Sequence, residues 1–334
     1  MSELFVPGRV NLLGEHIDYN GGRVLPTALP LGVTLSMTPR ADGTLSVRSD
    51  AFKDIAKRKI GEGAAGHWSD YILGAATLLE SEGADFRVAT TLPFGAGISS
   101  SAAITVGAIK ALAPDMPDVE AAVLARRVEN EFIGMPCGIM DQMAVAVARP
   151  GQVLSLDTDS LDFELIDLPE QATVAVVHSG VHRLLNEGRY AVRKEECDAV
   201  KRAAGRKDIC KMSDEELAQL ASLPGPLFAR ARHCVTEHRR SEEGADALKA
   251  GDTAKFGALM LASHASMRDD FEITVPAIDA MVETAAQAGA LGARMTGGGF
   301  GGCIVALLPQ TLDRNHWLDE LLAKHPDGHL VCWI

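Results

Sequence analysis

A predicted strand, a glycine-rich loop and a predicted helix follow one another in residues 86–113, and this order restricts the possible folds more than any other part of the chain. FRVATT alternates in the way of a strand, and the alanine-rich run after the loop is typical of a helix. Gly95 and Gly97 lack a Cβ atom, so the loop between them can take positive φ angles and direct its N–H groups at an anion. A glycine turn without any ligand has the same sequence, so both interpretations stay open here.

Three serines, Ser99, Ser100 and Ser101, stand at the start of that predicted helix. Unpaired N–H groups and the helix dipole attract phosphate at such a position. Serine hydroxyls can also bind a phosphate oxygen or Mg²⁺. The chain contains no GxxxxGK[ST] pattern, which excludes a nucleotide-binding loop of the Walker type.

A second glycine-rich run, TGGGFGG at residues 296–302, contains the pattern GxGxxG at Gly297, Gly299 and Gly302. A dinucleotide-binding oxidoreductase therefore has to be considered. That fingerprint must open into a helix, whereas CIVALLP, which follows here, is predicted to be a strand. We interpret the run as flexible backbone that lets two strands and a nucleotide loop approach closely.

Charged and imidazole side chains gather near the N-terminus, where Arg9, Glu15, His16 and Asp18 lie within PGRVNLLGEHIDYNGG. Carboxylate and imidazole groups can hold sugar hydroxyls in fixed directions. A positive charge such as that of Arg9 can pair with a carboxylate or with a phosphoryl group in transfer. An ordinary exposed turn could carry the same residues, and spacing alone does not separate the two interpretations.

Three segments together resemble one family of enzymes. GRVNLLGEHIDYNGG is similar to the galactokinase signature, LPFGAGISSSAA to the ATP motif of the GHMP small-molecule kinases, and RMTGGGFGGCIVAL to their third motif. EFIGMPCGIMDQ and SHASMRDDFEITVPAID also resemble galactokinases in particular. On these motifs, which span nearly the whole chain, it is identified as a member of the GHMP kinase family.

The resemblance implies a two-domain GHMP kinase fold. Residues 1–167 would form an N-terminal domain similar to ribosomal protein S5 domain 2, with the sugar signature and the ATP loop. Residues 168–334 would form a ferredoxin-like C-terminal domain, with ATP and sugar bound in the cleft between the two. The irregular order of predicted strands and helices gives the same α+β class, and 334 residues with 47% hydrophobic content suit two globular domains.

The resemblance also gives individual residues an expected role. Arg9 would stabilise the transition state, Asp141 would be the catalytic base, and Ser101 and Glu129 would hold Mg²⁺. The sugar would be bound by Glu15, His16, Ile17, Asp18 and Tyr190. ATP would be bound by Gly95, Ala96, Gly97, Ile98, Ser99, Ser100 and Ser101. Trp68 would either line the adenine pocket or belong to the core.

The expected reaction transfers the γ-phosphoryl group of ATP to the anomeric (C1) hydroxyl of D-galactose and yields galactose 1-phosphate and ADP. Gly180, Gly188 and Arg189 depart from the family pattern near Tyr190. A kinase for N-acetylgalactosamine, arabinose or galacturonate therefore remains an alternative. So does a non-catalytic regulator that binds sugar and ATP, although the chain keeps the serine loop and Asp141, and such regulators tend to lose residues from that loop.

Charge and hydropathy exclude several classes of partner. The net charge of −13 repels nucleic-acid phosphates and anionic lipid headgroups. The chain has no apolar run of about 20 residues that could span a bilayer, and its first residues do not resemble an export signal. We therefore expect a cytoplasmic protein with no nucleic-acid or membrane partner. The resemblance implies a small-molecule sugar and ATP as partners, and our expectation for the oligomeric state is a monomer.

Overall fold

The fold is described from a computed structural model, which describes residues 3–181 and 187–334. The chain divides into two compact units, neither of them a continuous piece of sequence. The first comprises residues 1–9, 28–94 and 98–148, and the second comprises residues 10–27, 95–97 and 149–334. The domain bounds 1–167 and 168–334, which the sequence suggests, stay a prediction.

The first unit contains a sheet in which strands follow the order β3-β6-β4-β5, and β1 pairs with β3. The bounds are β1 Glu3–Asn11, β3 Pro26–Pro39, β4 Thr44–Ser49, β5 Ile55–Lys59 and β6 Ala84–Thr90. Strand β6 is antiparallel to β3 and parallel to β4, whereas β4 and β5 are antiparallel.

The alternation over residues 31–49 predicts a hairpin, and that prediction is wrong. Both strands exist, but β6 lies between them. The N–H groups of Arg40 and Gly43 donate to the carbonyls of Gly83 and Glu82, at 3.0 and 2.8 Å, instead of closing a turn on each other. The turn at Gly43 therefore places β4 on the far side of β6, a strand that comes much later in the sequence.

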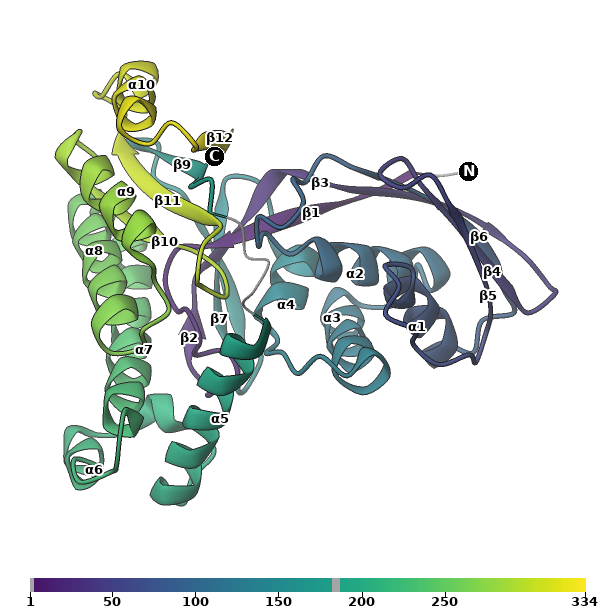
Figure 1. The fold of residues 1–334 in the computed structure, drawn as a ribbon, viewed down its shortest axis with the longest axis horizontal. Helices are drawn as coiled ribbons and strands as arrows, with labels where there is room; N and C mark the ends of the chain where they lie inside the picture. The colour runs from purple at the N-terminus through teal and green to yellow at the C-terminus, as the bar shows by residue number, and fades with distance from the viewer. Residues whose placement is uncertain (1–2, 182–186) are drawn as a thin grey trace. The chain divides into compact units, whose positions relative to one another are not determined.

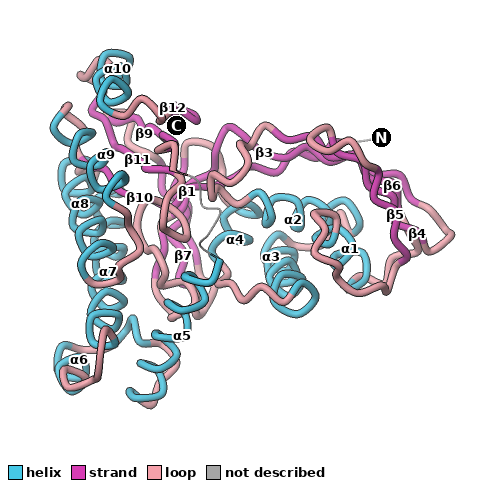
Figure 2. Tube along the Cα trace, in the orientation of Figure 1, coloured by secondary structure: helices cyan, strands magenta, loops and turns pink. Residues whose placement is uncertain are grey.

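Helices cover one face of this sheet, as the colours of Figure 2 make clear. They are α1 Asp70–Leu78, α2 Ser100–Leu112, α3 Asp118–Arg127 and α4 Met140–Val147, and a π-helical turn, η1 Val128–Ile133, follows α3. A Cβ atom at Gly107 would lie 2.3 Å from the Leu35 side chain and 3.2 Å from that of Val6. Helix α2 therefore packs so closely against β3 and β1 that a larger residue at Gly107 would force the Leu35 side chain to shift.

The second unit contains an antiparallel sheet in the order β10-β11-β9-β12. The bounds are β9 Ala172–His178, β10 Gly292–Met295, β11 Cys303–Pro309 and β12 His329–Trp333. The strand after the second glycine run is thus β11, which confirms the argument against a dinucleotide fingerprint. Strand β7 (Gln152–Asp157) pairs with β2 (Arg23–Val24) and with β8 (Phe163–Asp167).

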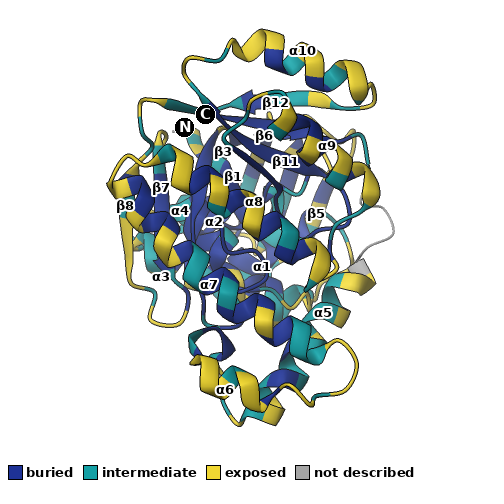
Figure 3. Ribbon diagram, turned by 90° about the vertical axis from the view of Figure 1, so that its left-hand side faces the viewer, coloured by how far each residue is buried: buried dark blue, intermediate teal, exposed yellow. Residues whose placement is uncertain are grey.

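Figures 1 and 3 show the helices of the second unit, whose outer faces are exposed while β11 is buried. Their bounds are α5 Glu187–Ala204, η2 Ile209–Lys211 (a 3₁₀ turn), α6 Asp214–Gln219, α7 Leu227–Lys249, α8 Thr253–Asp269, α9 Pro276–Gln287 and α10 Arg314–Lys324. The sequence predicts the first of these over 184–204, and residues 184–186 lie outside the described part of the chain. Within that described part, no helix is both long and apolar enough to cross a membrane.

Candidate active site

The carboxylate of Asp141 lies in the first turn of α4 and is held by two side chains of the first unit. Arg9 donates to Asp141 Oδ1 from Nε at 2.9 Å and from Nη2 at 2.6 Å. The Ser99 hydroxyl donates to Oδ2 at 2.7 Å. The Arg9 side chain is 5% exposed and that of Asp141 is 31% exposed, so the guanidinium is buried while the carboxylate still reaches the surface. The structure therefore brings together two residues that are 132 positions apart.

The backbone around this cluster fits tightly. Arg9 donates its N–H to the Ile98 carbonyl at 3.2 Å, which ties β1 to the residues that precede α2. A Cβ atom at Gly8 would lie 2.8 Å from that same carbonyl oxygen. Ser99 has a left-handed backbone, with φ 65° and ψ 41°, and occupies the N-cap of α2 without capping it through its side chain. Its hydroxyl donates a hydrogen bond to Asp141 instead.

The glycine loop has the backbone that its sequence predicts. Gly95 and Gly97 have φ angles of 70° and 72°. The 13-residue helix α2 begins at Ser100 and presents the unpaired N–H groups of its first turn. Gly95 is exposed and Ser100 and Ser101 are half-buried, whereas the side chains of Ala96 and Ile98 are buried. This arrangement suits the binding of a phosphate group by backbone N–H groups.

Glu129 is a buried carboxylate in η1, 5% exposed, and its Oε1 accepts from Gln142 Nε2 at 2.9 Å. Burial raises its pKa to about 7; the charge of Asp141 also raises it, while the hydrogen bond from Gln142 and the charge of Arg9 lower it. A buried carboxylate with such a pKa lacks a full compensating charge, and a cation would supply one. Oxygen donors such as Glu129 and the half-buried Ser101 suit Mg²⁺. The described residues contain no group of three or more His, Cys, Asp or Glu side chains arranged to hold a metal.

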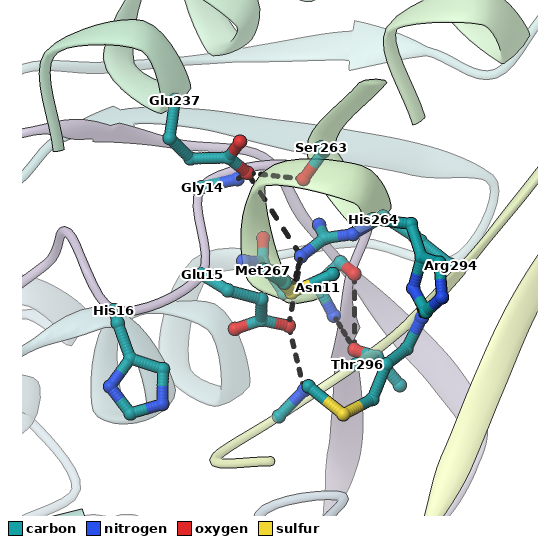
Figure 4. A network of polar contacts seen from close by, with 12 residues as sticks. Asn11, Gly14, Glu15, His16, Glu237, Ser263, His264, Met267, Arg294 and Thr296 are labelled. Atoms are coloured by element: carbon teal, nitrogen blue, oxygen red, sulfur yellow. Dashed lines mark hydrogen bonds and ion pairs between the residues drawn. The ribbon is translucent and has the colours of Figure 1, made fainter. Parts of the chain in front are cut away.

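The sugar-signature segment belongs to the second unit, where backbone groups contact the side chains of Glu15 and His16, both of which are drawn in Figure 4. Glu15 is 2% exposed, and its Oε1 accepts from the Gly297 N–H at 2.6 Å. His16 is 3% exposed; its Nε2 lies 3.2 Å from the Gly298 carbonyl and its Nδ1 lies 2.7 Å from Tyr19 Oη. Because a carbonyl oxygen can only accept, Nε2 carries a proton. The glycine run that resembles a dinucleotide fingerprint thus holds both side chains.

Tyr190 joins this group, as its ring centroid lies 5.0 Å from that of His16. A Cβ atom at Gly298 would lie 3.5 Å from the Tyr190 ring, so the glycine allows the ring to approach the loop. Asp18 is half-buried, whereas Ile17 is 0% exposed and its carbonyl accepts from the N–H groups of Asn20 and Gly22. The structure therefore collects four of the predicted sugar-binding side chains in one region of the second unit.

One departure from the family pattern has a structural reason. Gly180 has a φ of 81°, and a Cβ atom there would lie 2.6 Å from the backbone oxygen and the Cβ atom of Asp327. Any side chain at this position would clash with Asp327. A second departure, Arg189, places its guanidinium 5.1 Å from the centre of the Phe300 ring.

An exposed aromatic group in the first unit went unnoticed in the sequence. Phe52 stacks on Trp68 with ring centroids 5.1 Å apart and an angle of 15°, and it meets Phe94 edge to face at 5.7 Å. Phe94 is 67% exposed and Phe52 is 39% exposed. Trp68 is half-buried and therefore no ordinary core residue. Their positions in separate loops give no local pattern, so the stacking of Trp68 on Phe52 could only be found in the fold.

The chain matches three family descriptions. Residues 4–39 match the galactokinase galactose-binding signature, residues 70–149 match the GHMP kinases N terminal domain, and residues 245–325 match the GHMP kinases C terminal description. It is 40% identical to the galactokinase of Roseiflexus sp. strain RS-1, over 91% of this chain and 83% of that protein. It is 38% identical to the galactokinase of Bos taurus, over 90% of this chain and 82% of that protein.

Solved structures agree with these matches. The crystal structure of Lactococcus lactis galactokinase complexed with galactose is similar with a TM-score of 0.92 and 31% identity, over 98% of this chain and 92% of that one. The Methanococcus jannaschii mevalonate kinase, with a TM-score of 0.72 and 21% identity over 98% and 96%, shares the fold. Together these findings confirm the predicted GHMP kinase fold. The chain belongs to the galactokinase family of the GHMP kinases and is an ATP-dependent sugar kinase.

Proposed function

We propose that this enzyme transfers the γ-phosphoryl group of ATP to the C1 hydroxyl of D-galactose. The observation that carries the proposal is the cluster of Arg9, Ser99 and Asp141, with its direct hydrogen bonds, at the N-terminus of a helix suited to phosphate. The choice of galactose rests on the relatives, because a similar structure was solved in complex with that sugar.

Asp141 accepts the proton of the sugar hydroxyl in this proposal. A hydroxyl group is a poor nucleophile at neutral pH, and a carboxylate within hydrogen-bonding reach accepts its proton during transfer. Arg9 donates two hydrogen bonds to Oδ1, whereas Oδ2 accepts one from Ser99 and has a second lone pair, so we assign the proton to Oδ2. Arg9 then offsets the charge that develops on the transferring phosphoryl oxygens.

ATP binding is assigned to the loop from Gly95 to Ser101, whose backbone N–H groups would bind the phosphates. Ser101 and Glu129 would hold Mg²⁺, and the bound ion supplies positive charge to the phosphate oxygens. The exposed rings around Trp68 would stack on the adenine base.

Sugar recognition is assigned to the side chains of Glu15, His16, Asp18 and Tyr190, and the buried Ile17 would support the turn that carries them. The two buried groups, Glu15 and His16, are fixed in direction by the glycine run, and a fixed partner can discriminate between epimers of a sugar.

An assay coupled to ADP release, run with a panel of monosaccharides, tests the proposal. We expect galactose to give the highest kcat/KM. A higher value for N-acetylgalactosamine, arabinose or galacturonate would assign a different substrate. Galactose binding without ADP release would identify a regulator instead of an enzyme, and omission of Mg²⁺ tests the metal. The proposal includes a monomer in the cytoplasm, and light scattering after size-exclusion chromatography tests the monomeric state.

A further inference from the structure

The turn that presents Glu15 and His16 has a strained backbone. Gly14 has a φ of 99°, and a Cβ atom there would lie 2.8 Å from the Arg23 carbonyl oxygen. His16 has a φ of 60°, which is uncommon for a residue other than glycine. For a residue other than glycine such a conformation is strained and persists only where its surroundings hold it. The surroundings of this turn therefore decide where its two side chains point.

Helix α7 supplies two groups that hold the backbone of this turn. Glu237 Oε1 accepts from the Gly14 N–H at 2.8 Å, and His233 Nε2 lies 3.1 Å from the Glu15 carbonyl oxygen. The two side chains are four residues apart, so they lie on the same face of the helix. Both are 0% exposed. The helix thus binds the N–H group on one side of the Gly14–Glu15 unit and the carbonyl on the other.

The protonation states of the two groups fit these bonds. Burial raises the pKa of Glu237, but Arg240, Arg294 and the Ser263 hydroxyl outweigh burial, so the pKa is well below its usual range. The side chain is therefore an ionised acceptor, which also receives Ser263 Oγ at 2.6 Å and Arg240 Nε at 2.8 Å. Burial lowers the pKa of His233 to about 4. A neutral ring that faces a carbonyl carries its proton on Nε2, so His233 donates to the Glu15 carbonyl.

Arg294 of β10 connects the helix to the Glu15 carboxylate (Figure 4). Its Nη2 lies 3.6 Å from Glu15 Oε1 and 4.0 Å from Glu237 Oε1, and the side chain is 0% exposed. One buried cation therefore lies between two buried carboxylates. Figure 4 also shows that the Glu15 oxygen bonded to Gly297 is on the side of Arg294, while its other oxygen is on the side of His16.

We propose that His233, Glu237 and Arg294 are positioning residues for sugar recognition: they hold the strained turn so that Glu15 and His16 face the sugar. This inference rests on the proposed function, since it concerns the sugar that the turn binds. The three residues need not touch the sugar, and their effect is transmitted through the Gly14–Glu15 backbone and the Glu15 carboxylate.

The substitution Glu237→Gln tests this directly, because it removes the negative charge at nearly constant volume. We expect the KM and the calorimetric Kd for galactose to rise at least tenfold, whereas the KM for ATP changes less than about twofold. The reason is that the acceptor of the Gly14 N–H loses its charge, and hydrogen bonds to charged groups are the stronger ones. Ser263→Ala removes a single donor to the same carboxylate. If Glu237→Gln does not fold, Ser263→Ala still tests the proposal. We expect it to raise the KM for galactose about threefold.

Trp317→Phe is the matched control. Trp317 is 0% exposed in α10, and its Nε1 donates to the Ala285 carbonyl, so the change destabilises the second unit by a lost buried hydrogen bond away from the sugar segment. We expect a lower melting temperature with an unchanged KM for galactose.

The outcomes separate this inference from the proposed function. A folded Glu237→Gln enzyme that keeps its KM and Kd for galactose within twofold overturns the positioning role and leaves the function intact. A parallel rise in both KM values overturns it too, because general destabilisation would then explain the effect. If the native enzyme prefers another monosaccharide, the proposed substrate fails, and a selective rise in the KM for that sugar still supports the positioning role.

Discussion

Replacement of Asp141 by asparagine should affect the catalytic rate and the stability of the fold by different amounts, so the two effects can be measured separately. The change keeps the volume of the side chain but removes the charge that Arg9 contacts through Nε and Nη2. An amide cannot accept the sugar proton, and loss of a general base typically costs ~10²–10⁴ in rate. We therefore expect kcat to fall by about 10³-fold, while the Kd for ATP stays within about threefold, because the glycine loop is unchanged.

The same change also costs stability, and the structure gives the size of that cost. Removing one partner of a buried ion pair costs ~3–5 kcal/mol. The Asp141 side chain is 31% exposed, however, so solvent screens the pair and we expect ~1–2 kcal/mol instead. A drop of a few degrees in melting temperature should result.

Asp118→Asn serves as the control for Asp141→Asn. Asp118 pairs with Lys110 Nζ at 2.9 Å, is 37% exposed and lies outside the proposed site. The Asp118→Asn protein should have a lower melting temperature and an unchanged kcat. Stopped-flow measurement of a single turnover and calorimetric titration of ATP give the two quantities. A folded Asp141→Asn enzyme with kcat within tenfold of the native value would refute the assignment of Asp141 as the base.

Three further predictions concern other parts of the chain. Glu129→Gln should raise the Mg²⁺ concentration for half-maximal activity at least tenfold; an unchanged metal titration would exclude Glu129 as a ligand. The pKa of His233 is about 4 in the folded protein and 6.5 for a free imidazole, so only the unfolded chain gains this proton as the pH falls below 6.5. The free energy of unfolding should therefore decrease by up to about 3 kcal/mol between pH 6.5 and 4, and a His233→Gln protein should lack that part of the slope in urea titrations. Gly257→Ala should destabilise the second unit by several degrees in a thermal melt, because the new Cβ would lie 2.3 Å from the Leu291 carbonyl oxygen; an unaltered melt would show that α8 can move away from β10.

Local patterns predict the elements of this fold better than their pairing. The strand, glycine loop and helix around Gly95 follow from residue types alone, because φ angles and helix starts are local properties. The pairing of the strands within residues 31–49 cannot be predicted in this way, because both strands pair with β6, which lies in a distant part of the chain. Helix α10 was overlooked although Asp313 carries an N-cap signal, accepting from the N–H groups of Asn315 and His316.

In the candidate site, too, some residues could be predicted from the sequence and others only from the fold. The resemblance of motifs suggested Arg9 and Asp141, and the structure brings them into contact. Glu237 had no such signal, because it lies in the charged run TEHRRSEE, which resembles a solvated helix face. Only the fold reveals that this carboxylate is buried against the Gly14 backbone. A buried charge with distant partners leaves no periodic pattern in a sequence.

Phosphorus NMR of the product formed from galactose and ATP decides where the phosphoryl group goes. If Asp141 takes its proton from the anomeric hydroxyl, the product signal will be split by coupling to the proton on C1, and the Asp141→Asn enzyme will produce that signal about 10³ times more slowly. A product signal coupled to the protons of any other carbon, or equal rates for the two enzymes, would contradict the mechanism.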